Sequence, residues 1–145
     1  MTPKETYYEI TANTIIKNLK KRQMEGYYCK SREEAVELAC SFLEKDSIVS
    51  FGGSMTLDET GMLAALRAKE DIRLLDRAAV APEQVPDIYA GAFTADAYFM
   101  STNAITLQGE LVNIDGNGNR VAALIWGPKQ VIILAGMNKV CSCVE

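Results

Sequence analysis

The first stretch with chemical potential spans residues 50–59, SFGGSMTLDE, which follows an apolar run and precedes a helical pattern. Glycines let a backbone approach a ligand closely, and the start of a helix offers free N–H groups with roughly half a positive charge. Ser54 and Thr56 add hydroxyl donors, so phosphate, carboxylate or a CoA-type pyrophosphate would fit there. Asp58 and Glu59 would compete with an incoming anion. The structural alternative is that the glycines only turn the chain and that Thr56 caps its own helix with Glu59.

Neither familiar phosphate-binding fingerprint is present. Gly52 is followed by Leu57 where a Walker loop needs its second glycine, and no Gly-Lys-Ser/Thr occurs. Gly116 and Gly118 are followed by Val121 instead of the third glycine of a dinucleotide motif. A P-loop and an NAD-type Rossmann site are therefore disfavoured.

A second polar stretch, residues 115–120 with the sequence DGNGNR, contains only residues that hydrogen-bond readily or accept a positive φ. An ordinary turn needs one such residue. A hairpin followed by a capped helix would explain about half of them, and the surplus favours a polar site. Asp115 could act as a base or orient a hydroxyl, and Arg120 could hold a carboxylate in a bidentate fork.

The composition excludes several classes of chemistry. The chain has no histidine, which removes the usual general base near pH 7, the Ser-His and Cys-His pairs and the commonest zinc ligand. Fifteen basic and nineteen acidic residues give a net charge of −4, so nucleic acid is not expected as a partner. The four cysteines are too scattered for an iron-sulfur cluster, and neither a metal nor a cofactor is expected.

A length of 145 residues predicts a single domain over residues 1–145. Capping boxes at Thr2, Ser31 and Thr56 predict three helices, the first ended by Gly26 and the second running to about Lys45. Further helices are expected from Pro82 and over residues 120–126, with a β-hairpin over residues 105–114 and strands over residues 27–29, 47–51, 72–76, 97–100 and 130–135. This alternation predicts an α/β fold with a mostly parallel sheet and helices on both faces. No apolar run is long enough to span a membrane and no signal peptide is visible, so we expect a cytoplasmic protein.

Three segments, GGSMTLDETGM, STNAITLQGELVNIDGNGNRVAALIWGPK and QVIILAGMNKV, closely resemble the LUD domain, the LutC/YkgG family of lactate-utilisation proteins. The resemblance touches most of the chain from Lys4 to Val140. It implies a fold like that of the NagB/RpiA/CoA-transferase superfamily, with sites at the strand ends. By the same resemblance one pocket is formed by Gly52, Gly53, Ser54, Thr56, Asn103, Asp115, Gly116, Gly118, Asn119 and Arg120.

The resemblance also implies a partner protein, and the chain departs from the family's pattern at its C-terminal end. Chains of this family commonly continue past residues 136–140 into another helix and a cysteine-bearing tail, so we expect this domain to lack that C-terminal extension. Proteins of the lactate system work with iron-sulfur partners, and such a redox partner is expected here. Glu110 at the hairpin tip is a candidate nucleophile by analogy with CoA transferases, although tip glutamates more often serve solubility.

Three functions remain open at this point. The first is a part in lactate or small hydroxy acid utilisation, through binding of a small anion or of an iron-sulfur partner. The second is a stand-alone CoA-transferase-like or sugar-phosphate isomerase-like enzyme that uses Asp115 or Glu110. The third is a non-catalytic regulatory copy. A homodimer is the commonest soluble assembly.

Overall fold

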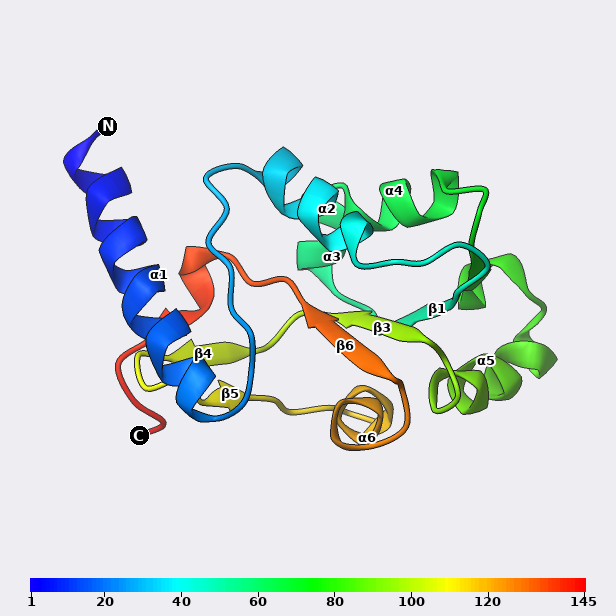
Figure 1. The fold of residues 1–145 in the computed structure, drawn as a ribbon. Coiled ribbons are helices and arrows are strands. Elements are labelled where there is room, and N and C mark those ends of the chain that lie inside the picture. Colours follow the sequence, from blue (N-terminus) through cyan, green and yellow to red (C-terminus); the bar gives the residue numbers. More distant parts are fainter.

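The computed structural model describes residues 1–145 and contains a four-stranded parallel sheet with the order β2-β1-β3-β6 (Figure 1). These strands are β1 (Ile48–Phe51), β2 (Arg73–Leu75), β3 (Ala97–Met100) and β6 (Gln130–Ile133). All pairings are parallel, with Ser50 opposite both Leu75 and Tyr98. The carboxyl ends of the strands therefore meet at one edge, where ligands bind in open α/β sheets.

Helices cover both faces of this sheet. On one face lie α2 (Arg32–Ser41), α3 (Met55–Glu59) and α4 (Met62–Ala68), and on the other α5 (Val85–Ala92) and α6 (Asn119–Ile125). Alternate residues of β3 serve the two faces: Phe99 joins the core with Leu66, whereas Tyr98 packs with Ala92 and Ala123. The predicted α/β class with a mostly parallel sheet and helices on both faces is confirmed.

A smaller sheet lies beside the first, with the order β5-β4-β7. The predicted hairpin forms its antiparallel pair, β4 (Ala104–Thr106) and β5 (Leu111–Val112), and β7 (Val140–Cys141) adds a parallel edge that the sequence did not predict. The long helix α1 (Pro3–Lys21) packs on the hairpin at one end of the molecule (Figure 1). Asn18 donates a hydrogen bond of 2.9 Å to the carbonyl oxygen of Leu107.

Local signals explain most of the helix starts. Thr2 and Glu5 form the predicted capping box, and the Ser31 side chain accepts from the backbone N–H of Glu34. The predicted start of α3 is wrong by two residues, because Ser54 rather than Thr56 is the cap and its hydroxyl accepts from the Thr56 N–H at 3.1 Å. Gly61, with φ of 81°, then separates α3 from α4.

Other boundaries also differ from the sequence prediction. Helix α2 ends at Ser41, four residues before the expected end, and residues 27–29 are not a strand because no other strand lies alongside to pair with them. Short 3-10 turns, η1 (Arg77–Ala79) and η2 (Pro82–Gln84), lead from β2 into α5, and η3 (Met137–Lys139) precedes β7. None of the helices combines the length and apolar composition of a membrane span.

Candidate functional site

The glycine corner, defined as residues 52–54 after β1, lies directly against Arg120 at the start of α6. A Cβ atom placed on Gly52 would lie 3.0 Å from Cγ of Arg120 and 2.7 Å from the hydroxyl oxygen of Tyr98. Gly52 is buried, and its amide donates to the carbonyl oxygen of Phe99 at 2.8 Å. The structure thus brings the glycine corner and the polar bend, defined as residues 115–120, to the same edge of the sheet.

Within the polar bend, the guanidinium of Arg120 is bound by several groups of the chain itself. It donates to Asp115 Oδ1 at 2.8 Å, to the carbonyl oxygen of Ser101 at 3.1 Å and to Asn103 Oδ1 at 2.5 Å. A longer contact of 3.4 Å reaches the carbonyl oxygen of Ile114. Only one of the five N–H donors is left over. The bidentate grip on a ligand carboxylate remains a prediction, and the geometry gives Arg120 a positioning role.

Asp115 is the acidic partner of Arg120. Its second oxygen accepts from the backbone N–H of Val121 at 2.6 Å, and the side chains of Asp115 and Arg120 are only 10% and 11% exposed. Burial alone would raise the pKa of Asp115, but the hydrogen bonds from Val121 and Arg120 outweigh it and leave the pKa below its ordinary value. Asp115 is therefore an ionised anchor for the bend.

The other predicted residues of the bend shape the chain. Gly118 has φ of 73° and precedes α6, and a Cβ at Gly116 or Gly118 would meet nothing within 4 Å. Asn119 is the first residue of α6. Asn103 lies across the bend, where its side-chain oxygen also accepts from the Ile114 N–H at 3.0 Å. These residues shape the bend that presents Arg120 to the glycine corner.

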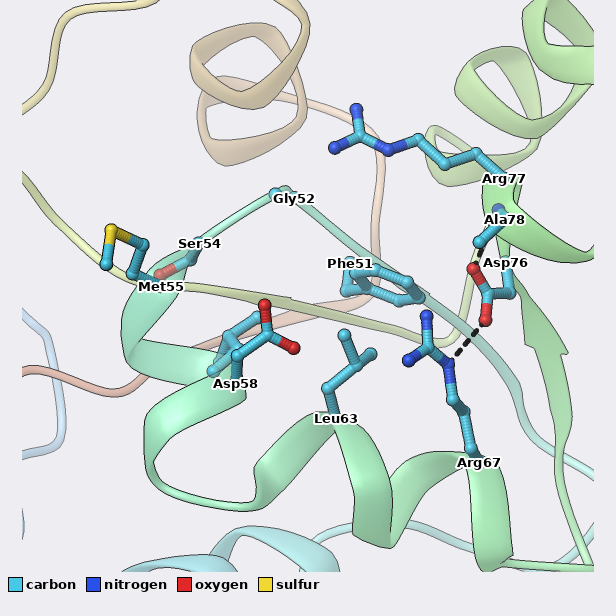
Figure 2. A pocket seen from close by; sticks show the side chains of 12 residues that line it. Phe51, Gly52, Ser54, Met55, Asp58, Leu63, Arg67, Asp76, Arg77 and Ala78 are labelled. Carbon is cyan, nitrogen blue, oxygen red and sulfur yellow. Dashed lines mark hydrogen bonds and ion pairs between the residues drawn. The ribbon is translucent and has the colours of Figure 1, made fainter. Parts of the chain in front are cut away.

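A pocket of about 540 Å³ opens on the other side of the glycine corner (Figure 2). Its polar lining includes Ser54, Asp58, Arg67, Asp76 and Arg77, and its apolar lining includes Phe51, Leu57 and Leu63. Figure 2 shows Arg67 paired with Asp76, while Arg77 extends over the corner and away from that pair. Of the predicted site residues, Gly52, Gly53 and Ser54 line this pocket.

The charges in the pocket are not equally available. Arg67 Nε lies 2.7 Å from Asp76 Oδ2, and Asp76 also accepts from the Ala78 N–H at 2.9 Å. The hydrogen bond from Arg67 is the main reason that the pKa of Asp76 is lowered. Arg77 has only a neutral partner, the hydroxyl of Tyr89 at 3.0 Å. Arg77 is exposed and is the pocket cation that no carboxylate neutralises.

The backbone of the glycine corner adds uncommitted donors. The N–H groups of Gly53, Ser54 and Met55 have no acceptor within the chain. A Cβ on Gly53 would lie 2.6 Å from Nη2 of Arg77, so the missing side chain is what lets the guanidinium reach this backbone. Helix α3 has five residues, and its dipole is correspondingly small. Arg77, which the sequence analysis missed, supplies the charge instead.

Tyr98 is the second residue that sequence reasoning missed. It is 2% exposed, and its hydroxyl lies at Gly52. Burial first, and then the charge of Asp115, raise the pKa of Tyr98 to about 12. The signal for both residues was available: Arg77 follows the end of a predicted strand, and Tyr98 is the hydroxyl-bearing residue of a buried one.

Glu110 lies apart from this pocket. It follows Gly109 in the hairpin that packs on α1, and its carboxylate accepts from the Thr106 hydroxyl at 3.0 Å. Thr56 lies inside α3 and does not line the pocket. The structure therefore brings Gly52, Arg120, Asp115 and Asn103 together and places Glu110 and Thr56 outside the pocket, and the single ligand pocket of all the predicted residues stays a prediction.

Comparison with known proteins gives one match. The family model of the LUD domain matches residues 12–145, which is nearly the whole chain. No curated protein matches the chain. No solved structure matches it either.

Proposed function

The chain belongs to the LUD domain family, and from this premise we propose that it takes part in the utilisation of lactate or a related small hydroxy acid by binding a small anionic ligand at the glycine corner. The carrying observation is Arg77, a cation without a carboxylate partner, at the rim of a pocket of about 540 Å³. The family resemblance links such domains to lactate utilisation, and lactate is itself a small anion.

The pocket lining holds two arginines and two aspartates, and it is the position of Arg77 at the glycine corner that supports an anion there. Arg67 is paired with Asp76 and is also the arginine on which the charge of Asp58 acts, so Arg77 is left without an ion pair. Arg77 reaches over the glycine corner, whose N–H groups at residues 53–55 have no acceptor within the chain. A carboxylate there would receive a bidentate arginine fork and backbone hydrogen bonds.

Oxidation of the acid is proposed to involve an iron-sulfur partner protein, as the family resemblance implies. Glu110 is held by Thr106 on the hairpin and is remote from the corner, which argues against a CoA-transferase-like nucleophile in this pocket. We therefore place binding in this chain and electron transfer in the partner.

The test is a thermal-shift titration with L-lactate, pyruvate and inorganic phosphate. Binding at one hundred times Kd raises the free energy of unfolding by about 2.7 kcal/mol, which a melting curve resolves. Arg77→Gln should abolish the shift. Arg73→Gln is the matched control, because Arg73 is an exposed arginine at the opposite end of β2.

Two results would contradict the proposal. One is the absence of any shift with all three anions. The other is an equal loss in the Arg77 and Arg73 variants, which would indicate a nonspecific effect of net charge.

A further inference from the structure

The hydroxyl of Tyr89 is the one side-chain partner of Arg77, although Tyr89 itself does not line the pocket. Arg77 Nη1 donates to the Tyr89 oxygen at 3.0 Å, and the pocket lining includes Arg77 but not Tyr89. A neutral hydroxyl that accepts from an arginine leaves the charge of the guanidinium in place. A carboxylate in the same position would instead neutralise it, as Asp76 does for Arg67. The contact with Tyr89 can therefore fix where Arg77 lies without competing with an anion for its charge.

The packing of α5 on β2 places these two side chains next to each other. A Cβ on Gly91 of α5 would lie 2.7 Å from Cδ1 of Leu75, the last residue of β2, so the helix approaches the strand closely. Tyr89 lies two residues before Gly91, and Arg77 lies two residues after Leu75. One close contact between helix and strand therefore holds the segment with the phenol beside the segment with the guanidinium.

Gly53 limits the position of the guanidinium from another side. A Cβ on Gly53 would lie 2.6 Å from Nη2 of Arg77, which is closer than Cβ atoms approach other heavy atoms. Gly53 does not adopt a positive φ, so its backbone conformation does not by itself require glycine. The absence of a side chain at this position therefore serves the approach of Arg77 rather than a left-handed turn of the chain.

We propose that Tyr89 and Gly53 are positioning residues, which hold the Arg77 guanidinium over the glycine corner before an anion binds. This inference rests on the proposed function and adds how its anion site is preorganised. An arginine side chain loses rotamer freedom when it binds a ligand, and a side chain that is already ordered loses less. Such preorganisation is worth about twofold to tenfold in affinity. Nε and Nη2 of Arg77 have no acceptor within the chain, so two N–H groups remain for the anion.

The first measurement is the order of the Arg77 side chain in the free protein, from nitrogen NMR relaxation of the arginine Nε–Hε groups. The Arg77 signal is identified by its loss in Arg77→Gln. Arg67 is the internal reference, because its Nε is paired with Asp76. In wild type both arginines should be ordered. Tyr89→Phe should lower the order parameter of Arg77 to below about 0.6, the range of flexible groups, and leave Arg67 unchanged.

Gly53→Ala provides a second, independent change to the same guanidinium. Its Cβ would displace Nη2 of Arg77, so the order parameter of Arg77 should fall here too. Tyr27→Phe is the matched control for Tyr89→Phe, because Tyr27 is exposed and its ring lies on Phe42. It should leave Arg77 as ordered as in wild type. None of the three substituted residues is buried, so all three variants should keep the urea midpoint of wild type.

The second measurement is the affinity of each variant for L-lactate, pyruvate and inorganic phosphate, by ligand-detected NMR titration. Tyr89→Phe and Gly53→Ala should each weaken anion binding by about twofold to tenfold, and Tyr27→Phe should bind as wild type does. The double variant of Tyr89 and Gly53 should lose less affinity than the product of the two single losses, because both residues act through one guanidinium.

Each other outcome counts against the inference in a distinguishable way. An Arg77 that is mobile in wild type, or equally ordered in Tyr89→Phe, overturns it. Unchanged anion binding in Tyr89→Phe, or losses that multiply fully in the double variant, also overturns it, while the proposed function stands because wild type binds. A lowered urea midpoint in Tyr89→Phe shows a structural role for the hydroxyl and overturns it as well. Failure of all three anions to bind wild type removes the proposed function together with this inference.

Discussion

Two arginines flank the glycine corner, and they differ in how fully their guanidinium groups are paired. Arg120 is 11% exposed in its side chain and is bound by Asp115, Asn103 and a backbone carbonyl. Arg77 is exposed and is bound only by a neutral phenol. Arg120, in the polar bend, thus holds the protein's own structure together. Arg77, in a segment with no such run of polar residues, is available for a ligand.

A sequence segment rich in polar residues can form many hydrogen bonds, but the sequence does not say whether they form within the protein or with a ligand. In the polar bend these hydrogen bonds form mostly within the molecule, where they fix the start of α6. At the glycine corner few polar side chains are present, but their donors face the pocket.

The largest expected effect comes from Arg120→Gln. Removing the guanidinium leaves a mostly buried Asp115 carboxylate without its charged partner, which destabilises proteins by roughly 3–5 kcal/mol. Urea denaturation measures the loss. If the variant were as stable as wild type, the bend would not depend on this pair and the contrast with Arg77 would disappear.

Gly52→Ala should have the next largest effect. Its Cβ would press on the Tyr98 hydroxyl at 2.7 Å, and the ring is buried and rigid, so overpacking of about 1–3 kcal/mol is expected. Gly53→Ala is the informative control, because its Cβ meets only the end of the flexible Arg77 side chain. Equal urea midpoints for the two variants would contradict the expected difference between Gly52 and Gly53.

Acid should lower the stability that the ion pair of Asp115 and Arg120 contributes. Because the folded-state pKa of Asp115 is lowered, its contribution is present above the ordinary value near 3.8 and is lost as pH falls through the folded pKa. The same sign holds for Asp76 and Asp96, so the urea midpoint should drop below about pH 4. Asp115→Asn should have a shallower acid limb than wild type, and an unchanged limb would show that Asp115 is not linked to folding.

Arg77→Gln should have the smallest effect on stability. The side chain is exposed and its one partner is neutral, so a change within about 0.5 kcal/mol is expected in the urea midpoint analysis. The variant therefore separates binding from folding. A large loss of stability would place Arg77 with Arg120 in the framework.

Most of the fold could be predicted from the sequence, because the local sequence signals agree with the overall arrangement of helices and strands. The capping boxes at Thr2 and Ser31, the apolar strand before Gly52 and the hairpin around Gly109 are each visible in a few neighbouring residues. Thr56 was mistaken for a cap because Ser54, two residues earlier, offers the same chemistry, and only the backbone conformation decides between them. The two-residue strand β7 exists through its pairing with β4, which no local pattern records.

The adjacency of the two segments of the candidate site could be predicted from the sequence, but the pairing of their side chains could not. Glycines at a strand end indicated the edge, and the alternation of strands and helices brought the polar bend to the same edge. What decides the role of Arg77 and Arg120 is whether acceptors surround each guanidinium in three dimensions. Such pairing depends on contacts between segments far apart in the chain, and single-residue chemistry does not reveal it.

The turn of the hairpin touches the backbone of α1 with almost no room to spare. A Cβ on Gly109 would lie 2.9 Å from the backbone nitrogen of Leu19, and α1 has only three buried residues along its length. The main apolar clusters contain no residue of α1. The helix can therefore detach as a local opening event while the pocket stays intact, and its amide protons should exchange with solvent long before those of β3 do.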